Sequence, residues 1–294
     1  MHIPVLLNEV LEFLDPKPGN FIIDGTVDGG GHSQEILKKI GSSGQLLGVD
    51  LDPGMVKKTR RALGREANCT IVEGNYADLK SILKKKKLGK ANGLLLDLGF
   101  SSEQIENSGR GFSFSVMPGE EPLLMTYSDN FTPVKDILRG LKEEEIAKII
   151  FDYSGEKFSR RIAASIKSVS RIRKIETSYE LAEIIRKAVP HGYERGRIDP
   201  ATRTFQALRI YANHELENLE KILAELPEIL VSGGRAVIIS FHSLEDKIVK
   251  QSFREFSKNK IGNLIIKKPI GPTREEELAN PRSRSAKLRV LEII

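Results

Sequence analysis

An apolar strand, an acidic residue, a glycine cluster and a helix start follow one another near the amino terminus, in an order that builds a cofactor pocket. Residues 21–33 read Phe-Ile-Ile-Asp-Gly-Thr-Val-Asp-Gly-Gly-Gly-His-Ser. Glycines let the backbone turn sharply and approach a ligand closely, and the unpaired N–H groups of the following helix attract an anionic group. We expect Ser33 to cap this helix and Gly41 to end it. The alternative is an ordinary tight turn.

A second carboxylate stands at the spacing that suits a nucleoside-containing cofactor. Residues 46–50 form a short apolar strand that ends in Asp50, 26 residues after Asp24. In dinucleotide-binding folds, an acid about 20 residues beyond the glycine motif accepts hydrogen bonds from a ribose. The glycines depart from the dinucleotide fingerprint and leave less room for a pyrophosphate. The turn is closer to the S-adenosylmethionine turn of class I methyltransferases.

Further strand-like runs predict a parallel sheet. Residues 93–97 and 234–240 are apolar almost throughout, as strands covered by helices on both faces require. Residues 264–266 and 288–291 are compatible with an antiparallel pair that closes the sheet, the usual ending of a class I methyltransferase sheet. The pattern therefore predicts an α/β fold of the class I, Rossmann-like methyltransferase type with an inserted all-helical domain.

Helical periodicity dominates the long segment between Asp97 and Ser240. We predict helices over 143–151, 158–167 and 179–188, and one long helix that starts at Asp199-Pro200 and runs through Leu223 back to the sheet. We assign residues 1–106 and 206–294 to the cofactor-binding core, and residues 107–205 to an inserted domain that recognises the substrate.

The charge balance indicates a nucleic-acid partner. The net charge is +6, and residues 155–215 alone hold 13 Lys or Arg against 7 Asp or Glu. A clustered positive surface attracts phosphates through counterion release, so RNA or DNA is the natural substrate. A solvated helix face is the alternative interpretation. The run of lysines at 84–87 fits an exposed helix end or loop, and nucleic-acid contact is the alternative.

Composition favours a cytoplasmic enzyme. The 294 residues are 39% hydrophobic and 29% charged, enough chain for one large domain with an insertion or for two domains. The apolar runs have the length of strands, and neither a membrane-spanning segment nor a signal peptide is evident. The single cysteine, Cys69, is expected in the core. The five histidines lack metal-ligand spacing, so we expect no metal.

Two loops carry residues suited to chemistry. Residues 97–104 and 239–246 each leave a strand at its carboxyl end, the edge where ligands bind in open α/β sheets. A capped helix start at His242 or Ser243 is the structural alternative for the second loop. Residues 280–289 place four cations among small hydroxyl residues, which suits a phosphate backbone, although a flexible basic loop is the simpler interpretation.

Seven blocks of sequence together resemble the RsmH (MraW) family over nearly the whole chain. The blocks are residues 2–7 (His-Ile-Pro-Val-Leu-Leu), 30–33 (Gly-Gly-His-Ser), 95–99 (Leu-Leu-Asp-Leu-Gly) with Ser101 and Ser102, 110–114 (Arg-Gly-Phe-Ser-Phe), 201–207 (Ala-Thr-Arg-Thr-Phe-Gln-Ala), 239–246 (Ile-Ser-Phe-His-Ser-Leu-Glu-Asp) and 280–285 (Asn-Pro-Arg-Ser-Arg-Ser). The resemblance implies a bacterial enzyme that transfers a methyl group from S-adenosylmethionine to the N4 amine of a cytidine in the decoding region of 16S ribosomal RNA.

The resemblance also implies roles for individual residues. It implies that Gly30, Gly31 and His32 bind the methionine end of the cofactor and that Asp50 binds its ribose. Further cofactor contacts are assigned to Tyr76, Asp97 and Gln104. We expect Asp24 either to fix the turn or to act on the methionine amine indirectly, through residues that contact it. The chemistry needs an acceptor that holds the N–H bonds of the cytosine amine, and Asp97 and Ser101 are the side chains that we expect in reach.

Two positions depart from the family pattern. Asp28 stands where the family usually has glycine, and residues 122–127 read Pro-Leu-Leu-Met-Thr-Tyr where Pro-Leu-Asp-Met-Arg-Met is common. The second departure weakens any inference about how the cytidine is held. Two other functions stay open: methylation of another base or of a protein, and a non-catalytic RNA-binding factor of ribosome assembly. The oligomeric state is undetermined, with a dimer as one option.

Overall fold

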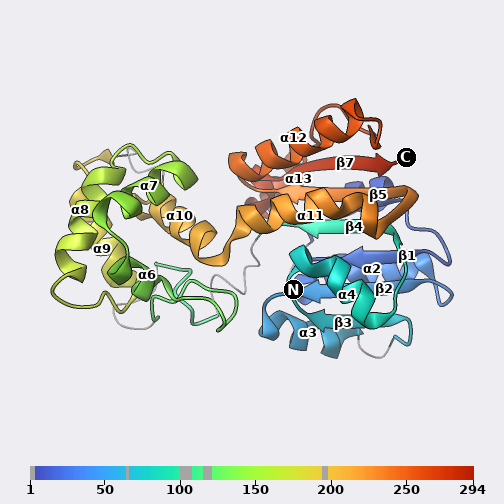
Figure 1. Ribbon diagram of the computed structural model, residues 1–294, viewed down its shortest axis with the longest axis horizontal. Coiled ribbons are helices and arrows are strands. Elements are labelled where there is room, and N and C mark those ends of the chain that lie inside the picture. Colours follow the sequence, from blue (N-terminus) through green and yellow to red (C-terminus); the bar gives the residue numbers. More distant parts are fainter. Residues whose placement is uncertain (1–3, 64–65, 100–107, 115–120, 194–197) are drawn as a thin grey trace. The chain divides into compact units, whose positions relative to one another are not determined.

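The computed structural model describes residues 4–63, 66–99, 108–114, 121–193 and 198–294 (Figure 1). The chain divides into two compact units, one made of Met1–Gly99 with Leu216–Ile294, and the other of Phe100–Glu215. A mixed sheet with flanking helices forms the first unit, and helices form most of the second.

Seven strands form the sheet of the first unit. They are β1 (Phe21–Asp24), β2 (Gln45–Asp50), β3 (Cys69–Glu73), β4 (Ala91–Asp97), β5 (Leu230–Ser240), β6 (Gly262–Leu264) and β7 (Lys287–Ile293). Their order is β3-β2-β1-β4-β5-β7-β6, and β7 runs antiparallel to both of its neighbours. The five parallel strands and the antiparallel closing pair confirm the predicted class I methyltransferase sheet.

Helices cover both faces of this sheet. They are α1 (Leu7–Leu14), α2 (Gly31–Ile40), α3 (Pro53–Leu63), α4 (Leu79–Lys86), α11 (Glu215–Ile229), α12 (Ser243–Lys258) and the short α13 (Arg274–Ala279). One face packs its core against α4, α11 and α12, and the other against α1 and α2. Neighbouring residues of β5 serve opposite faces, since Ile238 faces the first cluster and Val237 the second. This two-sided burial explains the uninterrupted apolar runs.

The second unit has its own apolar core. Its helices are α6 (Val134–Gly140), α7 (Glu143–Ser154), α8 (Ser159–Ser170), α9 (Ser178–Ala188) and α10 (Ala201–Asn213). The three helices predicted over 143–188 are confirmed as α7, α8 and α9. Several cations of this segment pair within the unit: Arg173 with Glu180, Arg186 with Asp199, and Arg209 with Glu215.

The single return helix predicted after Asp199 is wrong, because two helices stand there. Helix α10 ends at Asn213, and His214 has a left-handed φ of 53°. The side-chain amide of Asn213 is buried, and its nitrogen donates to the carbonyl oxygens of Met125 and Arg209. These bonds fix the end of α10 within the second unit, and α11 begins two residues later, at Glu215.

Cys69 lies half-buried in the edge strand β3, where burial raises the pKa of its thiol to about 11. A thiol with that pKa is a poor nucleophile at neutral pH, in line with the expected packing role. Among the described residues, no helix combines the length and the apolar character needed to cross a membrane.

Candidate cofactor site

The carboxylate of Asp24, at the end of β1, holds the turn that follows. One of its oxygens accepts a hydrogen bond from the N–H of Thr26 at 3.2 Å, and the other accepts from the Ser33 hydroxyl at 2.6 Å. The expectation that Ser33 caps the helix is wrong, because α2 begins at Gly31 and Ser33 lies inside its first turn. The Asp24 carboxylate is buried, at 1% exposure, and it accepts the hydrogen bond of the Ser33 hydroxyl. That hydroxyl is therefore not available to cap the helix.

Three successive residues of the turn adopt left-handed backbone conformations. The φ angles are 32° at Asp28, 78° at Gly29 and 90° at Gly30. Glycine adopts positive φ angles without strain, which accounts for the glycine that the family usually has at position 28. Aspartate, which stands there in this chain, is among the side chains that tolerate such angles best. The N-cap of α2 is Gly30, which has no side chain to cover the N–H groups of the first turn. That helix start therefore favours a bound anionic group.

Asp50 at the end of β2 is tied to the same turn. Its Oδ2 accepts from the N–H of Asp28 at 3.1 Å, and its Oδ1 accepts from the N–H of Asp52 at 2.9 Å. Burial raises the pKa of Asp50 to about 7, despite these two hydrogen bonds, and the nearby Asp28 carboxylate adds to the rise. Hydroxyl donors of a ribose would further stabilise the charged form.

Asp97 ends β4, the strand beside β1, and faces His32 of α2. The Oδ2 atom of Asp97 lies 3.8 Å from Nδ1 of His32, whose Nε2 lies 2.9 Å from the carbonyl oxygen of Val5. Since that carbonyl only accepts, Nε2 donates to it. Among the described residues, Oδ1 of Asp97 is buried without a hydrogen-bond partner. A buried acceptor of this kind can take a hydrogen bond from a ligand or from water.

The backbone of Asp97 is anchored by a residue that the sequence analysis missed. The N–H of Asp97 donates to Oγ1 of Thr26 at 2.7 Å, which joins the end of β4 to the turn after β1. The only signal in the sequence is a hydroxyl residue directly after Asp24-Gly25. Thr26 thereby sets the position of the carboxylate.

Tyr76 stands beside the turn. It begins a short 3₁₀ helix, Tyr76–Asp78, in which the Asn75 side chain accepts from the N–H of Ala77. A Cβ atom on Gly25 would lie 3.2 Å from Cβ of Tyr76, so a side chain at Gly25 would crowd the tyrosine. The structure thus brings Tyr76 to the sheet edge that holds Asp24. A ring that stacks on the nucleobase of the cofactor must lie at this edge.

The loop after β5 starts a capped helix, which confirms the structural alternative for residues 239–246. His242 is the N-cap of α12, and its ring accepts from the N–H of Glu245 at 3.4 Å. The Glu245 carboxylate accepts in return from the N–H groups of Phe241 and His242. The predicted contacts of Ser101 and Gln104 fall in the other loop and lie outside the described residues.

The carboxylates around the turn repel one another. Burial raises the pKa of Asp24 to about 6, and the Asp28 carboxylate adds to the rise. Burial also raises the pKa of Asp97 well above its ordinary value, with Asp28 and Asp24 as the next causes. A positively charged group of a ligand at this edge would relieve the repulsion.

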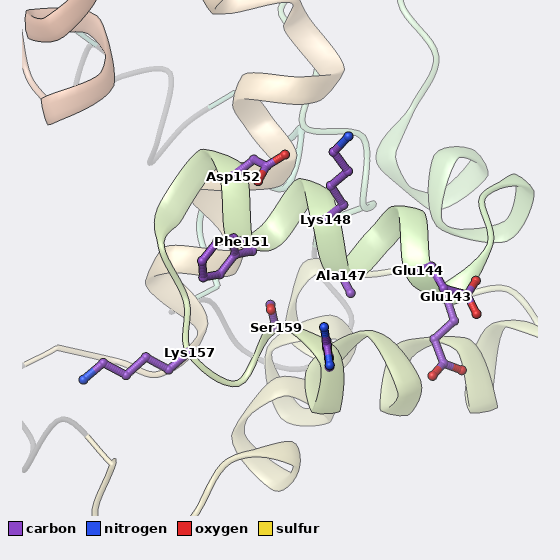
Figure 2. A pocket seen from close by; sticks show the side chains of 9 residues that line it. Glu143, Glu144, Ala147, Lys148, Phe151, Asp152, Lys157 and Ser159 are labelled. Carbon is purple, nitrogen blue, oxygen red and sulfur yellow. The ribbon is translucent and has the colours of Figure 1, made fainter.

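A separate hollow of about 790 Å³ lies in the helical unit, between α7 and α8 (Figure 2). Its lining residues are Glu143, Glu144, Ala147, Lys148, Phe151, Asp152, Lys157, Ser159 and Arg160. Three acids and three cations balance there, and none of the residues predicted to bind the cofactor contributes. This hollow is therefore distinct from the carboxylate edge of the sheet.

The full chain, residues 1–294, matches the model of a family described as MraW methylases. The chain belongs to the MraW methylase family. A relative from Deinococcus deserti, named Ribosomal RNA small subunit methyltransferase H, is 42% identical over 292 residues, which cover 99% of this chain and 93% of the relative. A relative of the same name from Clostridium botulinum strain 657 is 41% identical over 304 residues, with coverages of 98% and 97%.

As a member of the MraW methylase family, the protein is a methyltransferase whose cofactor is S-adenosylmethionine. The residues present fit that cofactor on two counts. Oδ1 of Asp97 is a buried acceptor that lacks a donor among the described residues. The grouped carboxylates of Asp24, Asp28 and Asp50 complement the positive charges of the sulfonium and the methionine ammonium.

Proposed function

We propose that the protein transfers a methyl group from S-adenosylmethionine to the exocyclic N4 amine of a cytidine in the decoding region of 16S ribosomal RNA. The observation that supports this function most directly is Oδ1 of Asp97, which is buried and lacks a hydrogen-bond partner among the described residues. It can accept an N–H bond at the edge that holds the cofactor turn. Relatives about 41% identical that are named for small-subunit ribosomal RNA support the substrate class.

The cofactor contacts follow the geometry of the turn. Asp50 accepts the ribose hydroxyls, Tyr76 stacks on the adenine, and the start of α2 at Gly30, Gly31 and His32 holds the methionine end. Asp24 acts through the turn, since both of its oxygens already accept hydrogen bonds within the chain. Gln104 supplies a further contact in this proposal. When bound, S-adenosylmethionine supplies a methyl group that its sulfonium already activates.

The task left to the protein is to orient the cytosine amine and to exclude water. The lone pair of that amine is delocalised into the ring, so the nitrogen is a poor nucleophile. An acceptor for its N–H bonds restores electron density on nitrogen. We assign this role to Asp97, with Ser101 as the second acceptor, and the Thr26 hydroxyl holds the Asp97 backbone in place for it.

The helical unit supplies substrate recognition in this proposal. Residues 107–205 would contact ribosomal RNA within the small subunit, and this substrate places the reaction in the cytoplasm. The departure at residues 122–127 falls in this segment, where the backbone N–H groups of Leu123 and Met125 donate to Glu176 and Arg110 carbonyls. Leu123 and Met125 are buried there, so this stretch packs into the core of the helical unit.

Nucleoside mass spectrometry tests the proposed function. Small ribosomal subunits that lack the modification are incubated with S-adenosylmethionine and wild type, Asp97→Ala or Asp15→Asn protein. Asp15 is exposed at the end of α1 and serves as the matched carboxylate control. N4-methylcytidine should appear with the wild type and the control, and fall by at least about 100-fold with Asp97→Ala.

Other outcomes separate the alternatives. Another methylated base would reassign the substrate. A protein that binds the cofactor in calorimetry but methylates neither RNA nor ribosomal protein would contradict the proposal and favour a non-catalytic assembly factor.

A further inference from the structure

Helix α12 carries a continuous row of cations that the sequence analysis did not use. Lys247, Lys250, Arg254 and Lys258 follow one another at steps of three or four residues, the spacing that places side chains on one helix face. Residues 247–268 contain seven Lys or Arg and a single acid, Glu255, for a net charge of +6. This segment therefore carries as much net charge as the whole chain.

The opposite face of α12 fixes the direction of this row. Val249 and Phe253 are buried at 1% exposure in the core that α12 shares with the sheet. A helix anchored on those two residues presents the four cations on its outer side, and Lys247, Arg254 and Lys258 are indeed exposed. Figure 1 shows α12 on the outside of the sheet, beside β7. The row is thus open to a partner.

Ion pairs among the described residues do not neutralise the four cations. Within the part of the chain that the structure describes, none of Lys247, Lys250, Arg254 and Lys258 forms an ion pair. Two acids are adjacent to the row in sequence: Asp246 is engaged by Lys287 and Arg289 of β7, and Glu255 forms no ion pair among the described residues. The cations of the helical unit differ, since many of those pair within the unit. The charge of the row on α12 is therefore not neutralised by ion pairs among the described residues.

The row starts at the edge of the sheet where the candidate cofactor site lies. Helix α12 begins at Ser243, directly after the carboxyl end of β5, and β5 runs parallel to β4, which ends in Asp97. Lys247 lies one turn into the helix. With a rise of 1.5 Å per residue, Lys258 lies about 16 Å farther along the axis. The row leads from the cofactor edge outward.

We propose that this face of α12 binds the phosphate backbone of the RNA substrate. Evenly spaced, exposed cations without an aromatic residue among them suit phosphates rather than bases, so the contact would position the RNA without reading its sequence. The inference rests on the proposed function for the identity of the RNA. It places the nucleic-acid contact on the core unit, in addition to the helical unit.

The test compares two variants that lose the same charge. The first carries Lys247→Gln, Lys250→Gln, Arg254→Gln and Lys258→Gln. The control carries the same change at Lys84, Lys85, Lys86 and Lys87, which are exposed at the end of α4. Binding to small subunits that lack the modification is measured over a range of salt concentrations, together with cofactor affinity by calorimetry and unfolding by urea.

The α12 variant should bind the subunit about tenfold or more weakly, with a salt slope smaller by about three, and should keep its cofactor affinity. The control should bind within about threefold of wild type. Equal losses of subunit binding in the two variants would overturn the inference. So would the result that polyglutamate competes with the subunit for the protein as strongly as RNA does. A wild-type protein that forms no methylated nucleoside would instead refute the proposed function, while a selective loss of RNA binding would still support the α12 contact.

Discussion

The backbone N–H of Asp97 donates to the Thr26 hydroxyl at 2.7 Å, so the ends of β4 and β1 are joined by a side chain rather than by the sheet ladder. The ladder between these strands pairs Asp24 with Leu95, two residues before Asp97. Thr26 extends the connection to the point where the chain leaves the sheet. The position of the Asp97 carboxylate therefore depends on a hydroxyl in the glycine turn.

Replacement of Thr26 by valine should lower both stability and cofactor affinity. Valine keeps the shape but removes the acceptor, which leaves the Asp97 N–H without its bond at a cost of about 1–3 kcal/mol. Urea denaturation measures this loss, and calorimetry measures the affinity for S-adenosylmethionine. Thr26→Ser, which retains the hydroxyl, should stay within about 0.5–1 kcal/mol of wild type. A loss in Thr26→Ser but not in Thr26→Val would show that the methyl group matters instead of the hydroxyl.

Replacement of Asp24 by asparagine should stabilise the unliganded protein above pH 7. An asparagine oxygen can still accept from the Thr26 N–H, and its nitrogen can donate to Ser33, so both hydrogen bonds survive. The buried charge is lost, and because the pKa of Asp24 is raised to about 6, its removal is worth about 1–3 kcal/mol at pH 8. Urea denaturation at pH 8 and pH 4 checks this. A gain of equal size at both pH values would contradict the charge argument.

The sequence predicted the sheet and the residues that gather at its edge, because both depend on local signals. Apolar runs that end in an acid marked β1, β2 and β4, and the carboxyl ends of parallel strands meet at one edge. The places of Asp24, Asp50 and Asp97 at the ends of these strands were therefore predicted from the apolar runs. The family resemblance supplied Tyr76 and His32, which no pattern in the residues themselves distinguishes.

What the sequence did not predict depends on contacts between distant segments. Ser33 has the right chemistry for a cap, but the buried Asp24 carboxylate takes its hydroxyl. The amphipathic pattern runs unbroken from α10 into α11, and the break at His214 follows bonds that Asn213 makes to Met125, far away in sequence. Thr26 was missed for the same reason, since its partner lies on another strand.

The stability of the unliganded protein should fall as the pH rises from about 4 to 8. The pKa of Asp50 is raised to about 7 and that of Asp24 to about 6, so the folded state holds protons that the unfolded state has released in this range. The stabilisation that these two carboxyl groups contribute to the folded state is complete below pH 4 and is lost as the pH rises through each folded-state pKa. The free energy of unfolding then falls by up to about 1.4 kcal/mol per pH unit for each group. Urea denaturation across this range measures the slope, and Asp24→Asn should reduce it. An unchanged slope in that variant would assign the dependence to other groups.

Affinity for S-adenosylmethionine should rise over the same pH range. Deprotonation of Asp24 and Asp50 increases the negative charge that faces the sulfonium and the ammonium, and the bound cations in turn lower the pKa of those carboxylates. Calorimetry in two buffers of different ionisation enthalpy should detect protons released on binding near pH 6. Binding without proton release would show that the carboxylates stay protonated in the complex.

Asp28 should make the site prefer the charged cofactor over its neutral-sulfur product. Its carboxylate adds to the raised pKa of Asp24, Asp50 and Asp97, so its field reaches each position at this edge. Asp28→Asn removes the charge and keeps a side chain that tolerates the φ of 32°, whereas Asp28→Gly also removes the backbone strain. In both variants the ratio of affinities for S-adenosylmethionine and S-adenosylhomocysteine should fall by about two- to tenfold. A change confined to the glycine variant would identify the backbone as the cause, and an unchanged ratio in both would show that Asp28 does not discriminate between the two ligands.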